Sequence, residues 1–282
     1  MLELKSTAAV STLVATIRSV IANGRTVSGS YPDPKARIEG YLSWVPASIR
    51  MLNSQLSEAD LSRLLATRTY WAALSTGSGE HATLWQLVDI ELNSQLELLS
   101  NELVELESTA HRWGSQNAEI AVLDSNVVMS AINKLAEIHW SQTLSTWPDT
   151  PVILAIPMQV IDEVDNLKDR GPNKDAQTKA RIALRTIEEW FTQPHNPHLV
   201  RPKHVENGDG TRPEVWARIW YDDLRHARLP VPDAEIVRRS LDLEPYGRNV
   251  TVITNDTSML LRARGAGLQA KRPALEKMHV VP

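Results

Sequence analysis

Four carboxylates that lie far apart in the sequence each stand at the end of a predicted strand or at the start of a predicted helix: Asp124, Glu163, Asp233 and Asp256. In an α/β fold, positions of this kind converge at one edge of the sheet. A group of like charges is unfavourable by itself, because repulsion opposes the ionisation of all its members. A hard divalent cation relieves that repulsion and prefers oxygen ligands. The four acids therefore predict a Mg²⁺ or Mn²⁺ site, and the simplest chemistry for such a site is cleavage of a phosphodiester.

Each acid also has an ordinary structural interpretation. Asp124 stands at a strand-to-helix junction, where aspartate often caps the helix, and Asp233 follows Pro232, which suits a helix start. Glu163 lies on a predicted amphipathic helix and fits an exposed polar face. Asp256 precedes a threonine and a serine, a composition typical of turns. The order of all four along the chain favours the metal-ligand interpretation.

The expected chemistry explains why carboxylates are needed. A phosphodiester is anionic, and a metal ion neutralises its oxygens, lowers the pKa of a bound water and stabilises the leaving oxygen. Asp124 is expected to be the most direct ligand. The other three acids complete the site directly or through water, because Mg²⁺ usually keeps several waters. No protein nucleophile is required, since activated water attacks.

Two polar residues beside these acids are candidates for orienting them. Asn126 follows Asp124 by two positions, and Thr254 precedes Asp256 by two. Side chains in such places hydrogen-bond the carboxylates of metal sites, but they also form local turn and cap bonds. Both interpretations are open for Asn126 and Thr254.

A path for an anionic substrate requires basic side chains, and a run of them follows Glu163. We expect this run to contact substrate phosphates, with a solvated charged helix as the competing interpretation. Its members are Lys168, Arg170, Lys174, Lys179 and Arg181.

Two tryptophans near other arginines also have two interpretations. Trp216 and Trp220 could stack on unpaired bases, as aromatic rings do in proteins that bind single strands. Alternatively, because they are four residues apart, they form the buried face of a short helix.

The elements that must position these residues begin with a helical domain of unknown role, residues 1–113. Helices are predicted over residues 8–22, 38–56, 57–74 and 80–112. A turn-rich break is predicted over 24–34, a loop over 75–79 and a linker over 114–117. Ser57 with an acid three positions later resembles a capping box. Leucines at three- and four-residue intervals mark the last helix as amphipathic. That helix belongs either to a bundle core or to a coiled-coil-like dimer contact.

From residue 118 onward, predicted strands alternate with predicted helices. The strands are expected near residues 120–123, 152–156, 199–200, 249–254 and 267–270. The helices are expected near residues 126–146, 159–168, 175–191, 233–243 and 258–264. Alternation of this kind predicts a parallel sheet with helices on both faces. The expected fold class is a three-layer, Rossmann-like α/β domain over residues 118–282, preceded by the all-α domain.

Composition excludes several other classes of protein. The 282 residues include no cysteine, which rules out disulfides, thiolate zinc sites and a cysteine nucleophile, and fits a reducing cytoplasm. No apolar run approaches the ~20 residues that span a bilayer, and the first residues lack the pattern of a secretory signal. A net charge of −4 argues against indiscriminate binding to nucleic acid. The absence of a glycine-rich phosphate loop excludes kinase and dinucleotide-binding functions. The histidines show no compact ligand spacing and are not assigned to a metal.

The acids and their neighbours occur in an order that resembles a known family. The first motif is a strand ending in Asp124-Ser125-Asn126. The second is a helix with the pattern Val-x-x-Glu-Val-Asp-x-Leu-Lys, from Val160 to Lys168. Then comes Asp233 at a helix start, with Ile236 three positions on. Last comes a strand ending in Thr254-Asn255-Asp256, followed by a helix and a glycine. These motifs resemble those of the PIN-domain ribonucleases.

The resemblance covers about residues 118–273 and does not reach the helical domain. It implies a divalent-metal-dependent endoribonuclease that acts on single-stranded RNA or RNA loops, with the four acids as its catalytic metal ligands. One departure is Ala234, where many members have a second acid. Glu235 is a candidate substitute, although it points in a different helical direction.

Other functions remain as alternatives. The carboxylate chemistry alone suits DNA equally, so RNA as substrate comes from the resemblance. The same resemblance allows a toxin held inactive by an antitoxin-like protein partner, beside a stand-alone RNA-processing or defence nuclease. A homodimer and a cytoplasmic location complete the expectations. The main alternative is a non-catalytic module that binds RNA or protein, and a metal-dependent phosphatase is a further one.

Overall fold

The computed structural model describes residues 2–5, 8–30, 33–75, 81–113, 117–206, 210–222 and 226–274. Contacts divide the chain into two compact units, Met1–Arg112 and Trp113–Pro282. Among the described residues, no helix combines the length and the apolar character that crossing a membrane requires.

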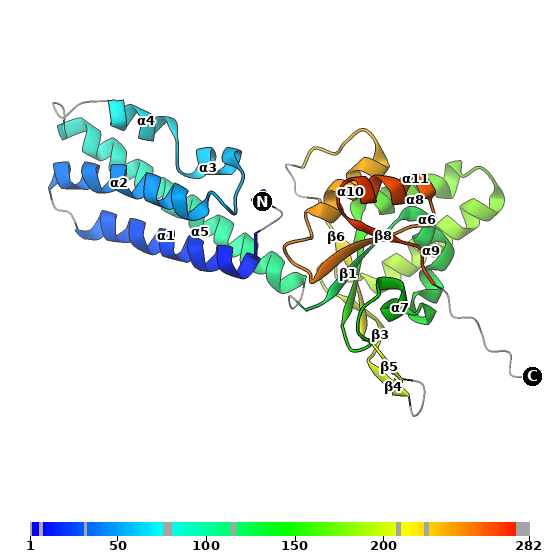
Figure 1. The fold of residues 1–282 in the computed structure, drawn as a ribbon. Coiled ribbons are helices and arrows are strands. Elements are labelled where there is room, and N and C mark those ends of the chain that lie inside the picture. Colours follow the sequence, from blue (N-terminus) through cyan, green and yellow to red (C-terminus); the bar gives the residue numbers. More distant parts are fainter. Residues whose placement is uncertain are drawn as a thin grey trace, which may run out of the picture. The chain divides into compact units, whose positions relative to one another are not determined.

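The first unit is entirely helical (Figure 1). Its helices are α1 (Val10–Ser30), α2 (Pro34–Leu52), α3 (Glu58–Leu64), α4 (Arg68–Ser75) and α5 (His81–Arg112). The apolar stripe predicted for the last helix is confirmed over most of its length, because Val88, Leu92 and Leu99 are fully buried. Leu87 departs from the prediction, since 52 % of it is exposed.

The predicted break over residues 24–34 is wrong for its first part, because α1 continues to Ser30. Glycine lowers helix stability by about 1 kcal/mol relative to alanine. Here it permits a close approach of helices: a Cβ on Gly24 would lie 2.7 Å from a methyl carbon of Leu96 and 3.0 Å from the ring of Trp44. Packing of α1 against α2 and α5 therefore overrides the local turn signal.

The helix predicted over residues 57–74 is divided into α3 and α4. Its predicted start is confirmed: the Ser57 hydroxyl accepts a hydrogen bond from the backbone N–H of Asp60 at 3.2 Å. The predicted loop over 75–79 and linker over 114–117 lie outside the described residues, apart from Ser75 and Asn117.

The second unit is built on a six-stranded sheet with the order β3-β6-β2-β1-β7-β8. The strands are β1 (Glu119–Leu123), β2 (Val152–Pro157), β3 (His198–Arg201), β6 (Val215–Trp220), β7 (Asn249–Ile253) and β8 (Gln269–Lys271). All neighbouring pairs are parallel except β3 with β6, which is antiparallel. Two further strands, β4 (His204–Glu206) and β5 (Gly210–Arg212), pair with each other and extend away from the sheet (Figure 1).

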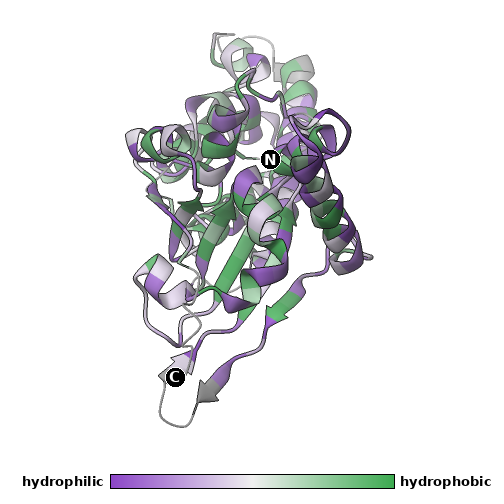
Figure 2. Cartoon of the chain, turned by 90° about the vertical axis from the view of Figure 1, so that its right-hand side faces the viewer, coloured by the Kyte–Doolittle hydropathy of each residue, from purple (hydrophilic) through white to green (hydrophobic). Residues whose placement is uncertain are grey.

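Helices connect and cover these strands, so the predicted α/β fold class is confirmed. They are α6 (Ser125–Ala131), the 3-10 helix η1 (Ile132–Glu137), α7 (Trp140–Leu144), α8 (Met158–Arg170), α9 (Lys174–Trp190), α10 (Pro232–Leu241) and α11 (Thr257–Gly265). The single helix predicted over residues 126–146 is therefore three shorter elements. The central strands β1 and β2 are buried along their whole length, as expected for parallel strands. Figure 2 shows these strands as mainly hydrophobic and the helices around them as largely hydrophilic.

The predicted short helix at Trp216 and Trp220 is wrong, because both residues lie on β6. A separation of four places two side chains on the same face in a strand as well as in a helix, so this spacing could not distinguish the two. Trp220 is buried, with its ring 4.9 Å from that of Trp113 and beneath the guanidinium of Arg239 at 4.5 Å. It is therefore a packing residue and not a platform for bases.

Candidate metal centre

Asp124 directly follows the central strand β1 and is buried, with 4 % of the residue exposed. One carboxylate oxygen, Oδ1, accepts hydrogen bonds from the backbone N–H of Ser125 at 2.7 Å and from its hydroxyl at 3.3 Å. The other, Oδ2, accepts from the Thr254 hydroxyl at 2.7 Å and from the Asn126 amide at 3.4 Å. Asp124 thus caps α6, as its ordinary interpretation predicted, and the same cap fixes the direction of its carboxylate.

Thr254 links the two strand ends of the site. The parallel register pairs Leu123 of β1 with Ile253 of β7, so the residues that follow them, Asp124 and Thr254, lie next to each other. The fully buried Thr254 hydroxyl donates to Asp124 and accepts from the backbone N–H of Asp256 at 2.9 Å. The Asp256 side chain is exposed and caps α11 by accepting from the N–H of Ser258 at 2.8 Å.

Glu163 lies on α8, and its surroundings disfavour its charged form. Burial raises the pKa of its carboxyl group, and the neighbouring charges of Asp124 and Asp233 raise it further. Hydrogen bonds from Gln159, at 3.2 Å, and from Ser125 oppose this shift. Glu163 is therefore within electrostatic range of both other acids.

Asp233 lies in the first turn of α10 and has a similar environment. Burial raises the pKa of its carboxyl group, and so do the charges of Asp124 and Asp256. The guanidinium of Arg262 acts in the opposite direction, with its Nε 3.6 Å from Asp233 Oδ2. The charge of Asp124 thus acts on both Glu163 and Asp233, and the charge of Asp256 acts on Asp233.

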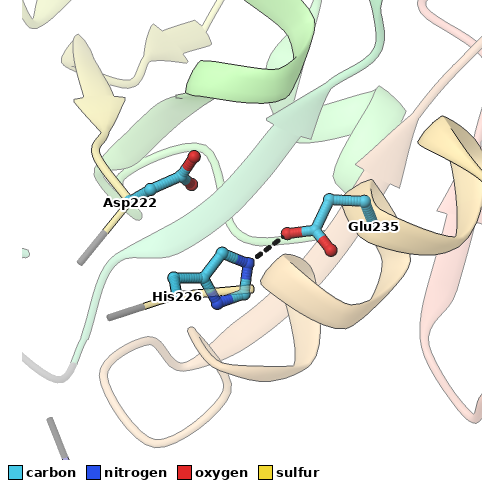
Figure 3. A group of neighbouring side chains, drawn as sticks. All are labelled: Asp222, His226 and Glu235. Carbon is cyan, nitrogen blue, oxygen red and sulfur yellow. Dashed lines mark hydrogen bonds and ion pairs between the residues drawn. The ribbon is translucent and has the colours of Figure 1, made fainter. Parts of the chain in front are cut away.

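In the part of the chain that the structure describes, no three of the four acids have ligand atoms within 4.8 Å of one another. Among the described residues, one group of three brings potential ligand atoms within 4.8 Å of one another, and it consists of Asp222, His226 and Glu235 (Figure 3). The histidine of this group had no assigned role in the sequence. Its Nε2 lies against a carboxylate oxygen of Glu235 at 2.5 Å.

Charges in the Asp222 group are already balanced by arginines. Arg228 donates to Asp222 Oδ2 at 2.6 Å, and Arg239 Nε lies 3.6 Å from Asp222 Oδ1. Burial alone would raise the pKa of Glu235, but hydrogen bonds from the Leu229 N–H and from His226 lower it overall. Two guanidinium groups and a satisfied buried carboxylate make this group unsuited to a cation. Glu235 consequently does not replace the acid that is absent at Ala234.

The donor set of the four-acid group does fit Mg²⁺ or Mn²⁺. Every ligand it offers is a carboxylate oxygen, which both ions prefer. Burial and, to a smaller extent, mutual repulsion raise the pKa values of Glu163 and Asp233, and a divalent cation would relieve the repulsion. Asp124 would hold such an ion most directly, because it is the buried member of the four and its charge acts on both Glu163 and Asp233.

The basic run predicted to contact phosphates is partly neutralised. Lys168 pairs with Asp165 at 2.5 Å, Lys179 with Asp175 at 2.7 Å, and Arg181 with Asp169 at 3.7 Å. These pairs match the competing interpretation of a solvated charged surface. Arg170 ends α8 and Lys174 begins α9, and both are exposed.

Sequence reasoning missed three residues that contact the acids, Ser125, Gln159 and Arg262. Gln159 precedes Glu163 by four positions, a spacing that places two side chains on one face of a helix. That spacing could have identified Gln159. Arg262 contacts Asp233 across two helices, α11 and α10, and local sequence carries no signal for such a pair.

Comparison with known proteins identifies the family of the α/β unit. No curated protein matches the chain. A family model described as the PIN domain matches residues 121–274, which is more than half of the 282 residues and includes all four acids. The helical unit lies outside the match. This chain therefore belongs to the PIN-domain family.

Proposed function

We propose that the protein is a divalent-metal-dependent endoribonuclease that hydrolyses phosphodiester bonds in single-stranded RNA or RNA loops. PIN domains are generally nucleases, and the family match supports this class of activity. The observation that carries the proposal is the buried, hydrogen-bonded Asp124 carboxylate at the end of β1, whose charge acts on Glu163 and Asp233. Burial and repulsion raise the pKa values of the latter two carboxyl groups, as expected for a group that binds a cation.

Asp124, Glu163, Asp233 and Asp256 would hold Mg²⁺ or Mn²⁺. When bound, the ion supplies an activated water and neutralises charge on the phosphate. The protein's own contribution is orientation. Thr254 fixes Oδ2 of Asp124, and the cap of α6 fixes Oδ1.

RNA as the substrate rests on the family and on basic side chains that the structure leaves exposed. Arg170 and Lys174 flank the turn between α8 and α9, close in sequence to Glu163. Their positions suit contacts with a phosphate backbone on the α8 side of the site. The ion-paired lysines and arginine of the same run would contribute less.

The test is incubation of the purified protein with a labelled single-stranded RNA and the matching DNA, in Mn²⁺, Mg²⁺ or EDTA. Asp124→Asn removes the central ligand. Asp149→Asn is the matched control, because Asp149 is an exposed aspartate paired with Lys203 at 3.0 Å. Metal-dependent RNA cleavage that Asp124→Asn loses and Asp149→Asn keeps is the expected result. Tight RNA binding without cleavage would instead favour a non-catalytic module.

A further inference from the structure

A short segment before α10 connects the helix that carries Asp233 with the helix that carries Glu163. This strap comprises residues 226–231 and runs from His226 to the start of α10. Its central side chain, Arg228, reaches α8, while residues on either side of it are attached to α10. None of these residues belongs to the four-acid group.

Glu235 holds the strap from the side of α10. Its two carboxylate oxygens accept from two different strap residues: Oε1 meets His226 Nε2 at 2.5 Å, and Oε2 accepts from the Leu229 N–H at 2.8 Å. Figure 3 shows the contact with His226. Glu235 is fully buried. Because both attachments flank Arg228, they fix the backbone from which its guanidinium projects.

Arg228 then links the strap to helix α8 and to the segment that follows β6. Its Nε donates to Oδ2 of Asp222, just after β6, at 2.6 Å. Its Nη1 donates to Asp162 and to the side-chain oxygen of Gln159, both on α8, the latter at 3.4 Å. A rigid, planar guanidinium suits this role, because its five donors have a fixed geometry.

The contact with Gln159 decides which way its amide faces. Arginine has only donors, so the amide oxygen of Gln159 must face Arg228. The amide NH₂ is then directed to Glu163, whose Oε1 lies 3.2 Å from Gln159 Nε2. Arg228 is thus linked through Gln159 to the Glu163 carboxylate, to which Ser125 also donates a hydrogen bond.

We propose that Arg228 is a positioning residue for the metal centre, acting through Gln159 on Glu163, and that the Glu235 anchor exists to hold Arg228 in place. The proposal rests on the metal centre of the proposed function. It assigns to the strap a role in ligand orientation, beyond simple packing of α10.

The experiment measures Mn²⁺ affinity of the full-length protein by electron paramagnetic resonance of the free ion, for Arg228→Gln, Gln159→Met and the double variant. Each single variant is expected to weaken Mn²⁺ binding by about 10-fold, the lower end of the range for partners of metal ligands. Because the two residues act in series, the double variant should be no weaker than either single one. Arg248→Gln is the matched control, because this substitution removes only a 3.8 Å ion pair between Arg248 and Glu119.

A merely structural role predicts a different pattern. Arg228→Gln would then lower the melting temperature in EDTA without changing Mn²⁺ affinity, and that result would overturn the proposal. Multiplicative losses in the double variant would overturn it too. If Arg228→Gln does not fold, Gln159→Met carries the test by itself, because Arg228 acts on Glu163 through Gln159. An unchanged Mn²⁺ affinity in Gln159→Met then overturns the proposal.

RNA cleavage is measured separately. Wild-type protein that binds Mn²⁺ but cuts no RNA would refute the nuclease, while the affinity cycle would still decide the role of Arg228. Wild-type protein that binds no Mn²⁺ would overturn both.

Discussion

The two halves of the acidic group are held in different ways. Asp124 and Asp256 belong to the strand-borne half, where a buried threonine hydroxyl and helix caps bind the carboxylates and their backbone. Glu163 and Asp233 form the helix-borne half, where burial and repulsion raise both pKa values. Long side chains, Gln159 and arginines, hold that half in position.

The difference has a physical origin in the backbone. Parallel register fixes strand ends relative to one another through main-chain hydrogen bonds, such as that from the Asp124 N–H to the Ile253 carbonyl at 3.1 Å. Helices α8 and α10 have no such ladder between them, so side chains must set the distance between Glu163 and Asp233. We therefore expect the strand-borne half to dominate metal binding and the helix-borne half to tune it.

The largest effect is expected from comparing Asp124→Asn with Asp233→Asn. Asp124 is buried and is proposed to be a ligand itself. Its loss should therefore lower cleavage by more than ~100-fold, the upper limit for residues that only support metal ligands. Asp233 is partly exposed and already shared with Arg262, so its loss should have the smaller effect. Cleavage rates of both variants in Mn²⁺ measure this, and a larger loss for Asp233→Asn would reverse the comparison.

Thr254→Val should have the next largest effect. The variant keeps the shape of the side chain but removes the donor to Asp124 and the acceptor for the Asp256 N–H. We expect Mn²⁺ affinity and cleavage to fall by about 10- to 100-fold. Thr178→Val is the control, because its hydroxyl bonds only to the Lys174 carbonyl within α9. Equal behaviour of the two valine variants would contradict the importance of the buried hydroxyl.

Arg262→Gln should act in the opposite direction. Arg262 is a cation that competes with a metal ion for Asp233, so its removal should tighten Mn²⁺ binding. The gain should be at most about fivefold, because exposed ion pairs contribute only ~0.2–1 kcal/mol. Titration with Mn²⁺, beside the exposed Arg238→Gln on the neighbouring helix, measures it. Weaker binding by Arg262→Gln alone would show that Arg262 supports the site instead.

The smallest effect concerns pH and stability. The folded-state pKa of Glu163 lies above its ordinary value, so folding favours the protonated form. Ionised Glu163 therefore destabilises the folded protein at neutral pH, and this effect disappears as the pH falls through the raised pKa toward the ordinary value.

Glu163→Gln should consequently raise the melting temperature in EDTA at neutral pH, with the difference shrinking in acid. In Mn²⁺ the order should reverse, because the wild-type protein gains more stability from the bound ion. Glu189→Gln, which affects only an exposed pair with Arg185, should change neither curve. A constant difference across pH would disagree with the assigned cause.

The strand-borne half was the more predictable one. Short β-branched runs ending in Asp124 and Asn255-Asp256 indicate parallel strands, and parallel strands bring their ends together. The positions of Glu163 and Asp233 on helices were also predictable from the order of motifs. The arginines of this half were not predictable, because Arg262 contacts Asp233, and Arg228 contacts Gln159, from segments whose conformation depends on tertiary packing.

Elsewhere, prediction failed where one local pattern fits two structures. Trp216 and Trp220 have a spacing that suits a helix and a strand equally. Gly24 is typical of a turn, yet in α1 it allows Trp44 and Leu96 to approach the helix backbone. In both places, contacts with distant parts of the same unit decide the local conformation.

The backbone hydrogen bond from the Asp124 N–H to the Ile253 carbonyl also affects how the protein loses activity when it is heated. Amides of central, fully buried strands exchange with solvent only when the whole cooperative unit opens. The N–H of Asp124 continues the β1–β7 ladder and should belong to this slowest-exchanging class. Partial opening of peripheral segments would then leave the central ligand in place. Thermal inactivation should therefore coincide with global unfolding of the α/β unit and show no earlier, local step.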